Sequence, residues 1–193
     1  MSSISTVRAT LLAAAIVAVA HASPVIAQTQ AGQVAAPVTP AAGEAAPDFM
    51  AMATDSSGKT SHVMLSSLRG KVVVLAFYPG DRTSGCTAEL NKFRDEYKTI
   101  FGDGVVVFPT SSDSLGSHAS WAKDSHFPFA MISDEKAELA TKYGAQGGGK
   151  YFKRSVYVIG KDGKIAYAEP KFNALAQEGY DKLTAAIKQA RAN

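Results

Sequence analysis

The hydrophobic positions of this chain switch from unbroken runs to helical spacing. Residues 71–78, KVVVLAFY, form a continuous β-branched and aromatic run, which is typical of a strand buried on both faces. Pro79 and Gly80 end this run, and a helical pattern begins near Cys86. Its apolar stripe consists of Leu90, Phe93, Tyr97 and Ile100/Phe101. The pattern therefore predicts a buried strand followed by an amphipathic helix.

The same alternation continues toward the C-terminus. The pattern predicts strands over residues 59–65, 105–110 and 127–132, and two more within residues 154–169 joined by the turn KDGK. It predicts helices over residues 114–125, 134–144 and 179–190. The core is expected to include Trp121, Phe127 and Phe129. This order of elements predicts a layered α/β domain with a central sheet covered by helices on both faces.

The N-terminal residues carry the pattern of an export signal. Arg8 is the only charged residue before Glu44, and LLAAAIVAVA over residues 11–20 is an apolar run too short to cross a bilayer as a helix. Small residues suited to a signal peptidase precede two cleavage points, after Ala22 and after Ala27. We expect export to the periplasm or out of the cell, without stable membrane insertion. An uncleaved membrane anchor is the alternative.

Three segments follow from this pattern. Residues 1–27 are the expected signal peptide. Residues 28–46, rich in Pro, Ala, Gly and Gln, lack periodicity and large apolar side chains, so we expect a flexible linker. Residues 47–193 then form one domain, since 193 residues are too few for two ordinary ones. A net charge of +3, without Lys and Arg runs among aromatics, argues against a nucleic-acid partner.

Cys86 is the only cysteine of the chain, so an internal disulfide is impossible. The thiol is either buried and inert, paired between chains, or reactive. Counting back four residues from Leu90 places Cys86 in the first turn of the helix, on the face of the apolar stripe. The free N–H groups and the dipole at a helix N-terminus favour an anion there. A thiolate held in this way is a nucleophile.

The residues around Cys86 suit such a site, although they also suit an ordinary turn from strand to helix. Thr83 places a hydroxyl three residues before the thiol, and Gly85 exposes its N–H. Pro79 shapes the loop after the strand. Glu89, one turn further on, shares the face of Cys86 and is suited to orienting a cation.

The segment FYPGDRTSGCTAEL, residues 77–90, resembles the active-site segment of the peroxiredoxins, whose pattern is a proline followed by Thr-x-x-Cys. The stretches FRDEY, SDSLGSHASWAKDSHFPFAMISDEKAELATKYGA and KRSVYVIGKDGKI follow the same family in order and spacing. The similarity is greatest to the bacterioferritin-comigratory branch and extends over residues 47–190. It implies a thioredoxin-like α/β fold with a central mixed β-sheet covered by helices on both faces.

The resemblance assigns roles to four residues. It implies that Cys86 is the peroxidatic cysteine, Thr83 its hydroxyl partner, Pro79 a shielding proline and Arg154 a fixed cation. The implied reaction reduces hydrogen peroxide or a small organic hydroperoxide, and the thiol becomes a sulfenic acid. No metal or organic cofactor is implied.

The sequence departs from the family pattern at three positions. Asn91 stands where many members of the branch carry a resolving cysteine, so the resemblance implies a one-cysteine cycle. An external thiol or a thioredoxin-like protein then reduces the sulfenic acid back to the thiol. Ser84 replaces a frequent proline, and Pro109 stands where the strand usually continues, so we expect an altered strand end. We expect a monomer or a homodimer.

Two other readings remain open at this point. The protein is a thioredoxin-fold redox sensor or binding module if Cys86 is oxidised only slowly, and an inert scaffold if the thiol is unreactive. The reaction rate distinguishes these readings, and the sequence does not. The histidines at positions 62, 118 and 126 lack metal-ligand spacing, and we expect His118 on a helix surface.

Overall fold

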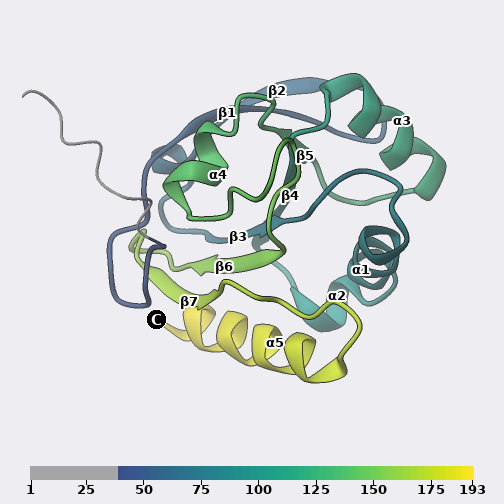
Figure 1. The fold of residues 1–193 in the computed structure, drawn as a ribbon. Coiled ribbons are helices and arrows are strands. Elements are labelled where there is room, and N and C mark those ends of the chain that lie inside the picture. Colours follow the sequence, from purple (N-terminus) through teal and green to yellow (C-terminus); the bar gives the residue numbers. More distant parts are fainter. Residues whose placement is uncertain (1–38) are drawn as a thin grey trace, which may run out of the picture. The chain divides into compact units, whose positions relative to one another are not determined.

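The central sheet determines where the candidate site lies. A computed structural model describes residues 39–193, whose seven strands form one mixed sheet in the order β2-β1-β5-β4-β3-β6-β7 (Figure 1). The strands are β1 (Met50–Thr54), β2 (Thr60–Met64), β3 (Val72–Phe77), β4 (Val105–Ser111), β5 (Met131–Ser133), β6 (Ser155–Ile159) and β7 (Ile165–Glu169). The helices are η1 (Leu65–Leu68), α1 (Ser84–Asp95), α2 (Tyr97–Ile100), α3 (Leu115–Ser125), α4 (Glu138–Lys142) and α5 (Gln177–Ala192). The expected signal peptide over residues 1–27 lies outside the described residues.

Strand β3 runs through the sheet and is buried along its whole length, as its apolar run predicted. It pairs in parallel with β4 and antiparallel with β6. Its successive side chains enter two separate cores, because neighbouring residues of a strand point to opposite faces. Val74 packs with side chains from α1, α3 and α5, whereas Leu75 packs with side chains from α4. Helices therefore cover both faces of the sheet, which confirms the predicted architecture.

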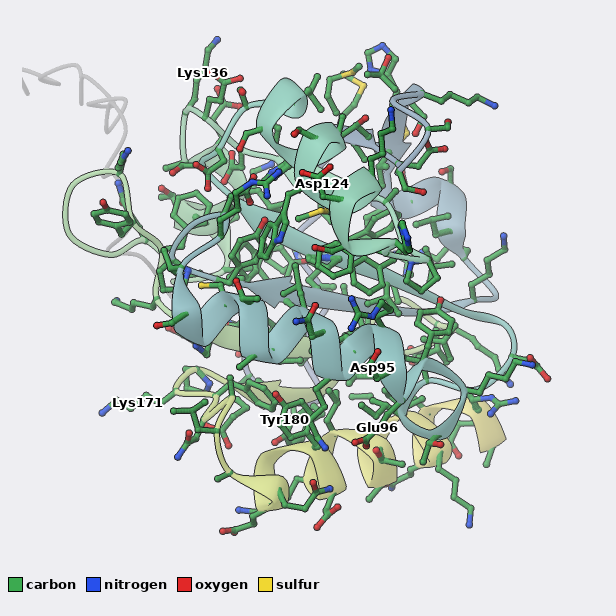
Figure 2. All side chains as sticks on the ribbon, turned by 90° about the vertical axis from the view of Figure 1, so that its right-hand side faces the viewer. Asp95, Glu96, Asp124, Lys136, Lys171 and Tyr180 are labelled. Carbon is green, nitrogen blue, oxygen red and sulfur yellow. The ribbon has the colours of Figure 1, made fainter. Side chains whose placement is uncertain are left out.

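Helix α1 begins at Ser84, slightly earlier than the apolar stripe suggested. Leu90 and Phe93 are buried as expected. The stripe does not continue as one helix, because Glu96 leaves helical geometry, with φ −108° and ψ 24°, before α2 begins. Phe93 packs edge-on against Tyr180 of α5 with ring centroids 6.0 Å apart, and Figure 2 shows Tyr180 between these two helices. This contact fixes α1 against α5 on the same face of the sheet.

Two predicted elements are shorter than their patterns. The strand expected over residues 127–132 is confined to β5, because Phe127 and Phe129 instead stack in the core, with ring centroids 5.1 Å apart. The helix expected over residues 134–144 is confined to α4. The Asp134 carboxylate accepts hydrogen bonds from the N–H groups of Leu139 and Ala140, and Ala137 has a left-handed φ of 55°. A cap and a turn therefore occupy the first residues of that segment.

Pro109 does not shorten β4, contrary to our expectation of an altered strand end. The strand continues through Pro109 to Ser111, and Pro109 stands opposite Ala76 of β3. The other neighbour, β5, pairs with β4 only from Thr110 onward. Pro109 therefore lies where β4 has a single partner strand, a place where a missing N–H is tolerated.

The folded part of the chain begins before residue 47, where composition placed its start. The N–H of Gly43 donates to the carbonyl of Ile165 at 2.8 Å, and the N–H of Ala46 donates to the carbonyl of Gly163 at 3.0 Å. These are main-chain contacts, which side-chain composition does not reveal. Among residues 39–193, no helix combines the length and the apolar character needed to cross a bilayer.

Candidate active site

Cys86 lies in the first turn of α1, just beyond the end of β3. The residue is fully buried and joins the core that includes Leu90 and Phe93. Both placements agree with the helical count made from the sequence. The sulfur therefore meets the positive end of the helix dipole in a place shielded from bulk water.

Arg154, the residue just before β6, reaches Cys86. Its Nη2 lies 3.4 Å from Sγ of Cys86. The antiparallel register of β3 and β6 pairs Phe77 with Ser155, so Arg154 stands beside the start of the loop that leads into α1. Gly85 leaves room for this approach, because a Cβ at position 85 would lie 3.3 Å from Nη2 of Arg154. The sheet thus delivers a permanent cation to the thiol.

Glu89 holds the other side of the guanidinium. Its Oε2 accepts a hydrogen bond from Nη1 of Arg154, and its side chain is fully buried. Oε1 has no hydrogen-bond partner within residues 39–193. Burial raises the pKa of Glu89 to about 7, although the charge and hydrogen bond of Arg154 act to lower it. The expectation that Glu89 orients a cation is confirmed.

Thr83 and Pro79 lie in the segment between β3 and α1, which leads into the helix turn that carries Cys86. Thr83 is the N-cap residue of α1, and its hydroxyl donates to the carbonyl of Gly80 at 3.2 Å. Pro79 is half-buried at the start of the loop. The structure therefore brings Cys86, Arg154 and Glu89 into contact and places Thr83 at the rim of the same helix turn.

A buried polar network lies behind the loop, and the sequence analysis missed it. Nδ1 of His118 lies 3.0 Å from both carboxylate oxygens of Asp81, and Nε2 lies 3.1 Å from the carbonyl of Ile132. The hydroxyls of Tyr78 and Ser117 donate to Asp81 at 2.7 and 2.6 Å. Burial acts to raise the pKa of Asp81. The hydrogen bonds to this carboxylate nevertheless hold the pKa below its ordinary value.

The expectation that His118 lies on a helix surface is wrong, because its side chain is fully buried. A signal was present in the sequence. His118 shares the spacing i, i+3, i+4 with Trp121 and Ala122, both of which are core residues of α3. Because histidine is polar, it was not counted among the apolar positions that mark the buried face.

A second set of contacts fixes the loop between β3 and α1. The N–H of Asp81 donates to Asp113 at 2.8 Å, which ties the loop to the end of β4. Arg82 has a left-handed φ of 60°, and its guanidinium pairs with Asp124 of α3 at 2.6 Å. Asp124 lies on the face of α3 seen in Figure 2. These contacts hold the first turn of α1 in place before any ligand binds.

A family model described as AhpC/TSA family matches residues 42–168, which is most of the described chain. The chain belongs to the AhpC/TSA family. Within residues 39–193 of this AhpC/TSA protein, no group of three or more His, Cys, Asp and Glu side chains is placed to hold a metal ion.

Relatives of this AhpC/TSA protein include members named for the branch that the sequence resembles. The putative peroxiredoxin bcp of Coxiella burnetii is 36% identical over 67% of this chain and 87% of its own. The chloroplastic peroxiredoxin Q of Triticum aestivum is 39% identical over 58% of this chain. The chain spans only 52% of the length of that plant protein.

The fold also agrees with a solved structure. The peroxidoxin BcpB of Mycobacterium tuberculosis superposes with a TM-score of 0.66 and 29% identity, covering 78% of this chain and 97% of its own. The resemblance to the bacterioferritin-comigratory branch and the thioredoxin-like fold are both confirmed.

Proposed function

We propose that this protein is a thiol peroxidase that reduces hydrogen peroxide or small organic hydroperoxides through Cys86. The observation that carries the proposal is the contact between Sγ of Cys86 and Nη2 of Arg154 at 3.4 Å, at the N-terminus of α1. Membership of the AhpC/TSA family supports it. A guanidinium and a helix N-terminus together favour the thiolate, which is the reactive form of the thiol.

The proposed step is a displacement at oxygen. The Cys86 thiolate attacks one oxygen of the hydroperoxide, so that an S–O bond forms while the O–O bond breaks. The second oxygen leaves with the electron pair and takes a proton, giving water or an alcohol. Arg154 stabilises the developing negative charge on the leaving oxygen. Sulfur is oxidised to sulfenic acid and the peroxide is reduced.

Thr83, Pro79 and the start of α1 complete the proposed site. The Thr83 hydroxyl turns from the carbonyl of Gly80 to donate to the bound peroxide, and the N–H groups of Gly85 and Cys86 add to this donor set. Pro79 shields the sulfur from water. Glu89 positions Arg154 without touching the peroxide.

Recovery of the enzyme depends on an external reductant in this proposal, because the chain holds one cysteine. A thiol attacks the sulfenic acid, forms a mixed disulfide with Cys86 and releases water; a second thiol then frees Cys86 and leaves as a disulfide. Cys86 is fully buried, so a reductant larger than a peroxide reaches it only after the start of α1 moves. Without reductant, excess peroxide carries the sulfur on to sulfinic acid.

We also propose that the protein works outside the cytoplasm as a monomer or a homodimer. The apolar run over residues 11–20 and the two cleavage points after it support export. The N-terminal mass of protein purified from its own cell tests this proposal. A chain that begins at Ser23 or Gln28 supports export, and an intact residue 1 contradicts cleavage.

Stopped-flow mixing of the reduced protein with excess hydrogen peroxide tests the peroxidase activity. Loss of the Cys86 thiol is followed in time, and the sulfenic acid is trapped and identified by mass. We expect a reaction several orders of magnitude faster than that of a free thiol, and none in the near-isosteric Cys86→Ser variant. An ordinary thiol rate would reject the peroxidase and favour the slow redox sensor.

A further inference from the structure

Three of the four methionines in residues 39–193 lie on one β-hairpin, in β1 and β2. Met50 is 67% exposed and Met64 is 44% exposed, whereas the fourth methionine, Met131, is fully buried. Methionine belongs to the residue types that are most often buried. Its concentration on an outward-facing surface therefore calls for a function other than packing.

The strand register places these methionines together with a histidine. Met50 is paired with Met64, and Met52 is paired with His62. Directly opposed residues of an antiparallel pair share a face, with Cβ atoms about 4.5–5.5 Å apart, and so do residues two apart along a strand. All four side chains consequently project from one face of the hairpin. The opposite face carries Val63, which is buried in the core.

This face of the hairpin is open to small solutes. Strand β5 pairs with β1 only from Met52 onward, so the start of β1 has no strand on that side. A cavity of about 400 Å³ lies here, and Met50, Met52 and His62 contribute to its lining. The lining also includes Asp134, Glu135, Lys136 and Glu138 from the segment that ends in α4. Lys136 extends outward from the body of the protein (Figure 2).

We propose that Met50, Met52, His62 and Met64 form a binding site for Cu(I). Three thioethers and one imidazole make a soft, uncharged donor set, which selects Cu(I) over harder cations. Zn²⁺ prefers thiolate, imidazole and carboxylate, and Mg²⁺ and Ca²⁺ prefer oxygen. The unbranched methionine side chain has several rotatable bonds, so opposed thioethers can converge on one ion without moving the strands.

The site is separate from Cys86. In the sheet order, β1 lies three places from β3, the strand that leads into α1. With strands about 4.8 Å apart, this places the hairpin about 14 Å from β3. The inference therefore does not depend on the proposed peroxidase, and loss of the methionines should leave the peroxide reaction of Cys86 unchanged.

A titration with Ag(I), a redox-inert probe for Cu(I), tests the site directly. The titration uses the Cys86→Ser variant, which lacks the only thiol. Labelling with ¹³C-methyl methionine lets NMR report on each thioether. We expect the methyl signals of Met50, Met52 and Met64 to shift together and to saturate at one equivalent. Met131 stands opposite Thr54 on the neighbouring strand β5. It should not move with them, because its side chain is fully buried in the core. Unchanged signals, or shifts that never saturate, would overturn the proposal.

Competition for Cu(I) with a coloured chelator gives the affinity. Met50→Leu/Met64→Leu keeps the apolar volume and removes two thioethers, and Met131→Leu is the matched control. We expect the double variant to lose about 100-fold in affinity, since even the outer partners of a metal ligand contribute about 10- to 100-fold. Met131→Leu should bind as the parent does. Equal affinity in the parent and the double variant would contradict the site.

Discussion

Nη2 of Arg154 lies 3.4 Å from Sγ of Cys86, although the two residues are 68 positions apart along the chain. The other terminal nitrogen of Arg154 is held by Glu89, so the guanidinium bridges a thiol and a carboxylate. A planar fork with two separate donor nitrogens suits this task, and a lysine ammonium does not. The orientation of the cation therefore matters as much as its charge.

The first prediction concerns this bridge. Arg154→Gln should slow the reaction with peroxide by about 10²- to 10³-fold, the usual effect of removing one preorganised donor. Arg154→Lys keeps the charge but cannot contact both partners, so its rate should lie between those of the wild type and Arg154→Gln. Stopped-flow rates of thiol loss measure both. Lys153→Met, at the exposed residue next to Arg154, is the control. Equal rates for all variants would show that Arg154 has no role in the reaction.

The sequence predicted most of the order of strands and helices, because alternating runs and stripes record burial locally, but it did not predict β1. The run over residues 71–78 and the place of Cys86 in α1 followed from spacing alone. Arg154 did not follow, because its contact with Cys86 depends on the register between β3 and β6. Only the family resemblance pointed to it.

The contacts of the polar network around Asp81 and His118 could not be predicted from local patterns either. Asp81 lies in a loop and His118 in a helix; aspartate is mostly exposed in proteins, and histidine is buried less often than apolar residues. Their contact becomes favourable only when α3 packs over the loop, so that Asp81, His118 and Ser117 become hydrogen-bond partners. A pattern based on residue type assigns such groups to the surface.

The second prediction concerns Thr83, whose hydroxyl donates to Gly80 rather than to sulfur. Thr83→Val should leave folding nearly intact and slow the reaction with peroxide by about 10²-fold, since one donor to the peroxide is lost. Thr83→Ser keeps the hydroxyl and should recover most of the rate. Rates and thermal melts of both variants make the comparison. A Val variant that reacts at the wild-type rate would reject the role of this hydroxyl.

The third prediction concerns the pH dependence of stability. Burial raises the pKa of Glu89 to about 7 from an ordinary value of 4.5. Between these two values the folded protein holds a proton that the unfolded chain has lost. The contribution of Glu89 to stability is therefore complete below pH 4.5 and falls as the pH rises to about 7.

Urea unfolding of the wild type and Glu89→Gln across this pH range measures the effect. Glutamine does not titrate, so the stability of the wild type should fall with pH relative to that of the variant. Glu135→Gln, at an exposed carboxylate, controls for the loss of one charge. A difference between wild type and Glu89→Gln that stays constant with pH would contradict the prediction.

The fourth prediction concerns Asp81, whose pKa is shifted in the opposite direction to that of Glu89. Although burial acts to raise it, the hydrogen bonds from His118 and its neighbours hold the pKa of Asp81 below 3.8. Its contribution to stability is present above that value and is lost as the pH falls through the folded pKa. Asp81→Asn should cost about 1–3 kcal/mol at neutral pH, because buried partners lose a charged acceptor.

Urea unfolding at neutral and acid pH tests the role of Asp81. The difference between the wild type and Asp81→Asn should shrink as the pH falls below 3.8. Asp103→Asn removes the same charge from an exposed loop and serves as the control. Since Asp81 belongs to the loop before α1, Asp81→Asn should also slow the reaction of Cys86 with peroxide. A variant as stable as the wild type at neutral pH would show that the network is dispensable.

The fifth prediction concerns Asn91, five positions after Cys86 in α1. Residues at this spacing in an intact helix are about 7.5 Å apart along the axis, given a rise of about 1.5 Å per residue. A disulfide needs Cα atoms no more than about 6.8 Å apart. Asn91→Cys should therefore form a disulfide with oxidised Cys86 only when the start of α1 unwinds.

Peroxide treatment of Asn91→Cys, followed by mass and circular dichroism, tests this geometry. We expect a mass loss of two hydrogens, no sulfinic acid and a reduced helical signal, all reversed by an external thiol. Asn91→Ser should behave as the wild type, which oxidises further because it has no second thiol. A disulfide formed with the helical signal unchanged would contradict the placement of Cys86 and Asn91 in one continuous helix. Sulfinic acid in place of the disulfide would mean that α1 does not open on the time scale of over-oxidation.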